Sequence, residues 1–374
     1  MSAIYIHIPF CNSKCHYCNF YSVVSTKNKF QLLKAINKEL NHRKNYLNNS
    51  VKTIYFGGGT PSIMTNDEIN SILQNIYKNY NVDSNCEITF EANPDDISKE
   101  KLIALKENGV NRLSIGIQSF DNNILKSLNR KHTAEQAINS VILAKELGFK
   151  NISIDLIYGI PGLSMDIWKN SLEIFKKLNI PHLSSYFLTV EPNTALDVLI
   201  KKGKYPQLME QDGIEHFDYL LEFCDKNNIE QYEISNFAKD GMISKHNTNY
   251  WKNNEYLGIG PSAHSFDGKS RQWNISSIKD YILSAEQEFK NIEKELLSEE
   301  DKFNEFIMLG LRTSWGINLT EIENKFGKEK LNYLISKINN YKNKHHIILK
   351  ENIILLSKSG KIYADGIASY LFMV

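Results

Sequence analysis

The sequence predicts an α/β protein built around a sheet of parallel strands with helices packed against it. Six short β-rich runs alternate with longer runs of helical periodicity, and strands joined through helices pair in parallel by right-handed crossovers. Strand-breaking or polar residues follow five of the six β-rich runs. In parallel α/β folds this end of the sheet carries the ligand site. Periodicity alone does not say whether the sheet curls into a barrel.

The predicted elements follow one another regularly through the first part of the chain. The β-rich runs are residues 4–8, 53–56, 87–91, 112–117, 152–158 and 183–190. The helical runs are residues 30–46, 66–77, 99–108, 134–147, 165–178 and 209–226. Apolar residues recur in them at helical spacing, as Ala137, Val141 and Ala144 do. The alternation therefore fixes the expected order of strands and helices.

The alternation of β-rich and helical runs weakens after Gly213. We therefore expect the chain to be organised in three parts. Residues 1–230 form the sheet domain, 231–297 an irregular connecting segment, and 298–374 a small C-terminal α+β subdomain. The middle segment is too long for a loop that only connects two elements of a compact domain, which indicates a functional insertion. The C-terminal part is expected to contain helices, one hairpin and a final helix; its expected elements are 302–311, 330–341, 346–349, 353–357 and the residues after Gly360.

Composition narrows the classes of function. Lys and Arg number 44 against 43 Asp and Glu, so no electrostatic excess indicates nucleic acid as a partner. No apolar run approaches the roughly 20 residues of a membrane-spanning helix. A predicted strand begins by Ile4, which leaves no room for a targeting segment, so we expect a cytoplasmic protein. Cys86 and Cys224 are expected to be small buried hydrophobes.

Cys11, Cys15 and Cys18 follow the first predicted strand in the spacing C-x3-C-x2-C. Three thiolates suit three irons of a four-iron cluster and leave the fourth iron open to another ligand. A disulfide framework is disfavoured because the cysteines number five and the chain is long. A zinc site would need a fourth ligand; His16 is the candidate, but it lies between two of the cysteines.

Other residues at the strand ends are candidates for a binding site. The glycine triplet 57–59 allows close approach of the backbone to a ligand, although it also suits a tight turn. Four polar residues lie at or beyond strand ends, where they either cap the strand or bind a ligand: Glu91, Gln118, Arg130 and Asp155. Asp155 interrupts an apolar run, and a buried carboxylate needs a partner or a ligand.

Together these motifs resemble those of radical S-adenosylmethionine (SAM) enzymes, in the branch of oxygen-independent coproporphyrinogen III oxidases and HemW-type haem chaperones. The resemblance rests on Pro9-Phe10-Cys11 with the cysteine motif and on residues 57–61, 91–94, 115–120, 155–162 and 356–365. It implies a partial (β/α)6 barrel, a [4Fe-4S] cluster on Cys11, Cys15 and Cys18, and SAM on the open iron. The residues that it implies for the SAM pocket are Tyr5, Gly58, Gly59, Thr60, Glu91, Gln118, Arg130 and Asp155.

Three features separate the oxidases from the chaperones. The oxidases resemble one another in having a further cysteine at the position where this chain has Phe20. They also carry an N-terminal extension over the active site, whereas only four residues precede Tyr5 in this sequence. The run His246-Asn-Thr-Asn-Tyr-Trp251 matches the H-N-x-x-Y-W motif of HemW-type chaperones. The resemblance implies haem contacts at His246, Tyr250 and Trp251, since an imidazole beside aromatic rings suits an axial ligand. A buried core histidine is the alternative reading, and His264 is a second candidate.

The function that the resemblance implies is a haem chaperone that passes haem to an acceptor haemoprotein. An electron donor for the cluster is a further expected partner. Oxygen-independent coproporphyrinogen III oxidase is the enzymatic alternative, and cleavage of SAM is left open. Balanced charge disfavours a radical SAM enzyme that modifies nucleic acid. A membrane-associated acceptor and a homodimer both stay open.

Overall fold

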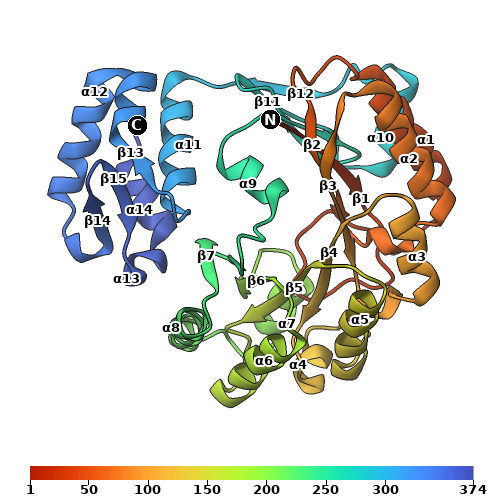
Figure 1. Cartoon of the computed structure of the whole chain (residues 1–374), viewed down its shortest axis with the longest axis horizontal. Coiled ribbons are helices and arrows are strands. Elements are labelled where there is room, and N and C mark those ends of the chain that lie inside the picture. The colour runs from red at the N-terminus through yellow and green to blue at the C-terminus, as the bar shows by residue number, and fades with distance from the viewer. Residues whose placement is uncertain (374) are drawn as a thin grey trace.

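A 12-stranded sheet organises most of the chain in the computed structural model, which describes residues 1–373 (Figure 1). Six of its strands pair in sequence order and run parallel to one another. They are β1 (Ser2–Ile8), β2 (Val51–Gly58), β3 (Val82–Ala92), β4 (Arg112–Gln118), β5 (Asn151–Tyr158) and β6 (His182–Phe187). The predicted α/β fold with six parallel strands is confirmed, although the sixth strand ends at Phe187 and not at residue 190.

Helices connect the parallel strands and cover the outer face of the sheet, as Figure 1 shows. They are α1 (Lys29–His42), α2 (Asn66–Asn79), α3 (Lys99–Glu107), α4 (Asn122–Ser127), α5 (Ala134–Glu146) and α6 (Met165–Leu178). Capping boxes at Thr65 and Thr133 satisfy the first backbone N–H groups of α2 and α5. Helix α4 was not predicted because its six residues are too short to show a period. No helix within residues 1–373 is long and apolar enough to cross a membrane.

The inner face of the curved sheet is polar, whereas the outer face is apolar. In β4, Leu113, Ile115 and Ile117 are fully buried in the hydrophobic core. Alternate residues of the same strand, Arg112 and Ser114, line an interior cavity. Successive side chains of a strand point to opposite faces, so one strand serves both the core and the interior. The barrel therefore encloses a polar space, unlike a parallel sheet with two apolar faces.

Residues 231–297, expected to be an irregular segment, instead contain short regular elements that lengthen the sheet at both ends. Strand β8 pairs antiparallel with β6, and β9 pairs parallel with β1. After α7 (Ala195–Lys201) and α8 (Glu210–Lys226) the elements are β7 (Glu230–Glu233), β8 (Asn236–Ala238), α9 (Lys245–Trp251), β9 (Tyr256–Ile259), β10 (His264–Phe266), β11 (Ser270–Trp273), α10 (Ile278–Glu286) and β12 (Glu293–Leu296). The expectation was wrong because strands of three or four residues are too short to show an alternation.

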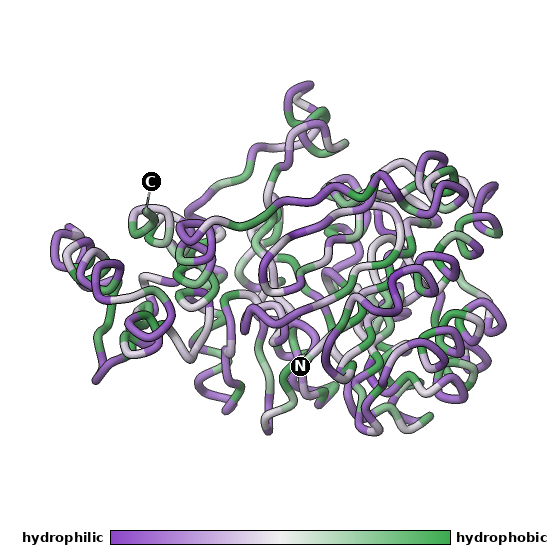
Figure 2. The backbone as a smooth tube through the Cα atoms, turned by 90° about the horizontal axis from the view of Figure 1, so that it is seen from above, coloured by the Kyte–Doolittle hydropathy of each residue, from purple (hydrophilic) through white to green (hydrophobic). Residues whose placement is uncertain are grey.

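The last part of the chain forms a smaller unit with its own hydrophobic core, in which Phe303, Ile307 and Leu334 are fully buried. Figure 2 shows this unit beside the larger one. Its elements are α11 (Glu299–Leu311), β13 (Ile317–Asn318), α12 (Leu319–Asn340), β14 (Ile347–Lys350), β15 (Ile353–Leu356), α13 (Lys358–Lys361) and α14 (Ala364–Leu371). Non-helical backbone at Gly327 divides α12 into two segments, and the second contains most of the predicted helix 330–341. Val374, part of the expected subdomain, lies outside the described residues.

Candidate functional site

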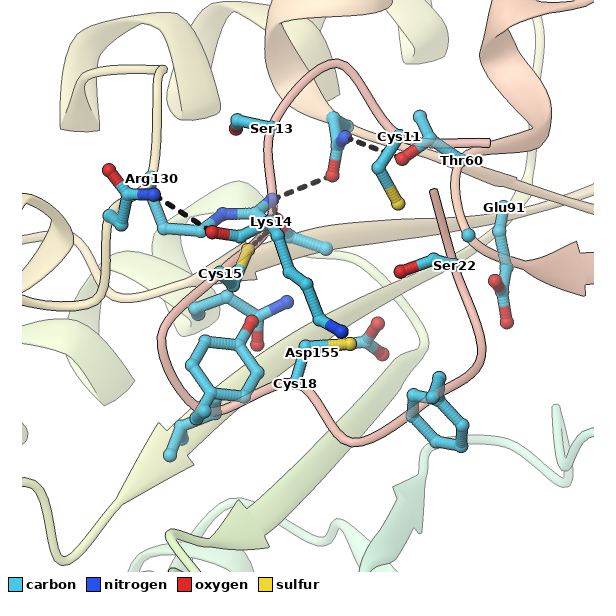
Figure 3. Close-up of a pocket in the computed structure, with 18 of the residues that line it drawn as sticks. Cys11, Ser13, Lys14, Cys15, Cys18, Ser22, Thr60, Glu91, Arg130 and Asp155 are labelled. Atoms are coloured by element: carbon cyan, nitrogen blue, oxygen red, sulfur yellow. Dashed lines mark hydrogen bonds between the residues drawn. The ribbon is translucent and has the colours of Figure 1, made fainter. Parts of the chain in front are cut away.

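The loop after β1 brings the three cysteines to the mouth of the barrel. The loop is closed at its base, where the N–H of Cys11 donates to the carbonyl of Val23 at 3.0 Å. Cys11, Cys15 and Cys18 are free, partly exposed thiols that line one cavity of about 630 Å³. Figure 3 shows their sulfur atoms directed into the space that the loop encloses. Among residues 1–373, no three His, Cys, Asp or Glu side chains are grouped closely enough for a single metal ion.

The glycine turn after β2 supports the start of the cysteine loop. The N–H of Gly59 donates to the carbonyl of Ile8 at 2.9 Å, and that of Thr60 to the carbonyl of Phe10 at 2.6 Å. A Cβ on Gly59 would lie 2.6 Å from the Phe10 carbonyl oxygen, and one on Gly58, whose φ is 109°, would lie 2.7 Å from the His7 ring. Both glycines are thus needed for close packing within the chain itself.

Arg130 joins the cysteine loop to the ends of two strands. Its guanidinium donates to the Cys15 sulfur at 3.3 Å, to Asn93 Oδ1 at 2.7 Å and to the Gly116 carbonyl at 2.6 Å. Arg130 was the least distinctive of the four polar candidates in the sequence, yet it donates directly to one of the three thiols. Gln118, at the end of β4, has a φ of 70°, a strained backbone conformation of a kind that occurs often at functional sites.

Glu91 and Asp155 separate the mouth cavity from a second cavity inside the barrel. Both side chains line the mouth cavity and also the interior cavity of about 230 Å³. Glu91 accepts a hydrogen bond from the Tyr55 hydroxyl at 2.7 Å, and Asp155 accepts one from Ser114 at 3.5 Å. Burial raises the pKa of Glu91 to about 7 and that of Asp155 to about 6. Their charge therefore changes near neutral pH.

The structure brings most of the candidate SAM residues together. Seven of the eight line the mouth cavity with the cysteines: Gly58, Gly59, Thr60, Glu91, Gln118, Arg130 and Asp155. Tyr5 is the exception, because it lines only the interior cavity, with its hydroxyl 3.3 Å from His7 Nδ1. The prediction that residues following different strands share one site thus holds for seven of the eight residues. Their role in SAM binding stays a prediction.

The His246 motif lies in the interior of the barrel, on α9 (Figure 1). His246 is 1% exposed; its Nδ1 lies 2.8 Å from Thr53 Oγ1 and its Nε2 lies 2.9 Å from the Tyr250 hydroxyl. The N–H of His246 donates to Glu87 at 3.1 Å. Both ring nitrogens are thus engaged, and burial lowers the pKa of His246 to about 3. In this conformation the imidazole has no free nitrogen for an iron atom.

Tyr250 and Trp251, the other two residues of the predicted haem contact, also make contacts within the protein. Tyr250 lines the interior cavity with His246. Trp251 lines neither cavity; the Arg312 guanidinium of the C-terminal unit lies 5.5 Å from its ring centroid. His264 is exposed, and its ring stacks on Trp273 at 6.0 Å. A haem contact at His246, Tyr250 and Trp251 stays a prediction.

Three residues of the two cavities were not singled out from the sequence. Arg112 lines the interior cavity, while Phe187 lines the mouth and Tyr186 lines both. The alternation of Arg112 and Ser114 with apolar residues was a usable signal for an inward side chain. Phe187 carried no signal, because its position depends on glycines far away in sequence. A Cβ on Gly159 or Gly213 would come within 2.3 Å or 2.1 Å of its ring.

The buried environment of His246 predicts a structural effect of its removal. His246→Ala should lower the free energy of unfolding by about 2–4 kcal/mol, because it opens a cavity and leaves the hydroxyls of Thr53 and Tyr250 without a partner. His264→Ala is the matched control and should change it by less than about 1 kcal/mol. Urea denaturation of both variants measures the difference. An unchanged stability of His246→Ala would show that these contacts do not form.

The comparisons with known proteins agree with this geometry. The chain matches the family models of the Radical SAM superfamily over residues 5–175 and of the HemN C-terminal domain over residues 297–362. It is 35% identical over 371 residues to the heme chaperone HemW of Bacillus subtilis, covering 98% of each chain. It is 36% identical to the heme chaperone HemW of Lactococcus lactis, covering 87% of this chain and 85% of the other.

The fold is also that of a solved protein. The structure of coproporphyrinogen III oxidase (HemN) from Escherichia coli aligns with a TM-score of 0.87 at 22% identity, over 100% of this chain and 90% of that one. At this identity the likeness establishes the fold alone. The two HemW relatives match at higher identity along most of the chain. The chain therefore belongs to the HemW family of the radical SAM superfamily.

Proposed function

We propose that this protein is a haem chaperone that binds haem and transfers it to an acceptor haemoprotein, on a fold that holds a [4Fe-4S] cluster and SAM. The names of the HemW relatives support the haem function. The observation that carries the proposal is a set of exposed aromatic rings at the rim of the mouth cavity, directly beside the three cysteines.

The residues at the barrel mouth fit the two cofactors. Cys11, Cys15 and Cys18 would hold the cluster, since thiolates are the usual protein ligands of iron–sulfur clusters. The Arg130 guanidinium donates a hydrogen bond to the Cys15 sulfur and so fixes the position of this ligand. Glu91 and Asp155 would hold polar groups of SAM at the base of the cavity. When bound, this pair of cofactors supplies one-electron chemistry, while the protein orients them and excludes water.

The cluster assignment predicts a specific effect of removing one thiol. Cys15→Ala should lose the visible iron–sulfur absorbance after anaerobic reconstitution with iron and sulfide, because two thiolates remain. Cys86→Ala is the matched control: its thiol is buried in the core, and it should keep the absorbance. Iron content per chain checks both results. A four-iron cluster retained in Cys15→Ala would refute the ligand set.

The rim of the mouth cavity suits a flat apolar ligand that carries carboxylates. Phe20, Tyr186 and Phe187 line it and are 71%, 42% and 39% exposed, which is unusual for large aromatic side chains. Aromatic rings stack on flat conjugated systems, and contact with haem would cover them. Lys14 and Lys131 line the same cavity and are exposed, so they can pair with the two propionates. We assign the haem contact to this rim.

Removing the rim aromatics tests this assignment. Phe20→Ser and Phe187→Ser should each weaken haem binding by about tenfold, from the loss of apolar contact worth about 1–2 kcal/mol. Phe30→Ser is the matched control, because Phe30 is 66% exposed but lies on α1 and does not line the cavity. Titration of each variant with haem, followed by the Soret band, measures the affinities. Equal affinity in all three variants and the wild type would place haem elsewhere.

The same titration distinguishes the rim from the His246 motif. At a temperature where His246→Ala remains folded, the rim assignment predicts an unchanged haem affinity for it. A specific loss of haem in folded His246→Ala would instead return the ligand role to that histidine.

A further inference from the structure

Arg112 is a buried cation that forms no ion pair with any residue among 1–373. It begins β4, is 2% exposed, and its Nε has no hydrogen-bond acceptor. Within residues 1–373 no carboxylate oxygen lies within 4.0 Å of its guanidinium. By contrast, the other buried arginine in the larger unit, Arg43, pairs with Glu39 at 3.2 Å and donates to Gln272 at 2.8 Å. A buried charge needs compensation, so the surroundings of Arg112 require an explanation.

Two carboxylates share the interior cavity with Arg112. Glu91 and Asp155 line this cavity of about 230 Å³, and both also line the mouth cavity above it. They therefore lie between the guanidinium on one side and the proposed SAM site on the other. Opposite charges that line one buried cavity attract each other across a space of low dielectric more strongly than they would in water. Among the residues that the structure describes, Arg112 is the only cationic side chain that lines the interior cavity.

We propose that Arg112 is a positioning residue of the mouth site, whose buried positive charge holds Glu91 and Asp155 as carboxylates and so prepares them for a cationic ligand. The inference rests on the proposed SAM site. SAM carries a sulfonium, an ammonium and a carboxylate group, hence one net positive charge at neutral pH. The two negative charges of ionised Glu91 and Asp155 are then balanced by the positive charge of Arg112 in the interior cavity and by that of SAM in the mouth cavity.

The titration of the two carboxylates agrees with this geometry. Burial raises the pKa of Glu91 to about 7 and that of Asp155 to about 6, while the positive charge of Arg112 lowers both. Arg130, on the mouth side, also lowers the pKa of Asp155. Loss of Arg112 would therefore raise both pKa values further, and at neutral pH the two groups would be protonated.

The other groups that face the interior are neutral or already engaged. Burial raises the pKa values of the tyrosines and lowers those of the histidines, which keeps them uncharged near neutral pH; these residues are Tyr5, Tyr55, Tyr250, His182 and His246. Two further buried carboxylates have partners: Glu87 accepts the N–H groups of Lys245 and His246, and Glu233 accepts from Asn236. Arg112 is thus left to act on Glu91 and Asp155.

The test is the pH dependence of SAM binding to the cluster-reconstituted protein, measured anaerobically by calorimetry between pH 5.5 and 9. Wild-type affinity should fall as the pH falls through about 7, because protonated carboxylates no longer attract the cation. In Arg112→Met the same decline should occur at least about one pH unit higher, so that affinity at pH 7 is about tenfold lower and recovers near pH 9. Arg112→Lys keeps the charge, and its profile should follow the wild type.

S-Adenosylhomocysteine provides a second measurement that does not depend on Arg112→Met being stable. It lacks the sulfonium charge, so its wild-type affinity should change less with pH than that of SAM. Arg112→Gln, which keeps a polar side chain, should show the same upward shift as Arg112→Met.

Two results would overturn the inference while leaving the SAM site intact. One is a midpoint of the pH profile that stays at the wild-type value in Arg112→Met or Arg112→Gln. The other is a loss of affinity that is equal at every pH, which a purely structural role would produce. If the wild type itself does not bind SAM, the proposed cofactor site is wrong and the inference falls with it.

Discussion

The two-residue alternation of side chains along the parallel strands is the constraint on which this structure depends. Each strand places isoleucine, leucine or phenylalanine against the outer helices and places polar residues inside. The outer face supplies the hydrophobic core, so the inner face is free to carry charge. An enclosed polar surface is costly unless its groups have partners or ligands. The interior of the barrel is therefore arranged to satisfy these groups, and the mouth is where ligands can complete the arrangement.

Helix α9 closes much of that interior. Glu87 accepts the N–H groups of Lys245 and His246 at the start of the helix, and His246 bonds Thr53 and Tyr250. The H-N-x-x-Y-W motif, which distinguishes the HemW-type chaperones from the oxidases, thus makes contacts inside the barrel in this conformation. The exposed aromatic rings lie instead at the mouth, beside the cysteines. On this account the motif shapes the scaffold, while haem and the cluster share the mouth.

Features with a local signal could be predicted from the sequence. The six strands showed β-rich runs with strand-breaking residues after them, and the cysteine loop showed its spacing. The resemblance placed eight SAM candidates in one pocket, and seven of them line the mouth cavity. The environment of His246 could not be predicted, because its partners Thr53 and Glu87 lie far away in sequence and only the tertiary fold brings them together. The exposure of Phe20 and Phe187 depends in the same way on neighbouring elements, and the sheet strands after residue 230 were too short to show a period.

In the proposed function, haem binds at the barrel mouth and is released from there to an acceptor protein. The most direct measurement is an anaerobic titration of the cluster-reconstituted wild type with haem, followed by addition of an apo-globin as acceptor. We expect a Soret band that saturates at one haem per chain and then moves to the globin position as haem is transferred. Absence of a saturable Soret band would contradict it, as would decarboxylation of coproporphyrinogen by the same preparation with SAM at a rate typical of an enzyme.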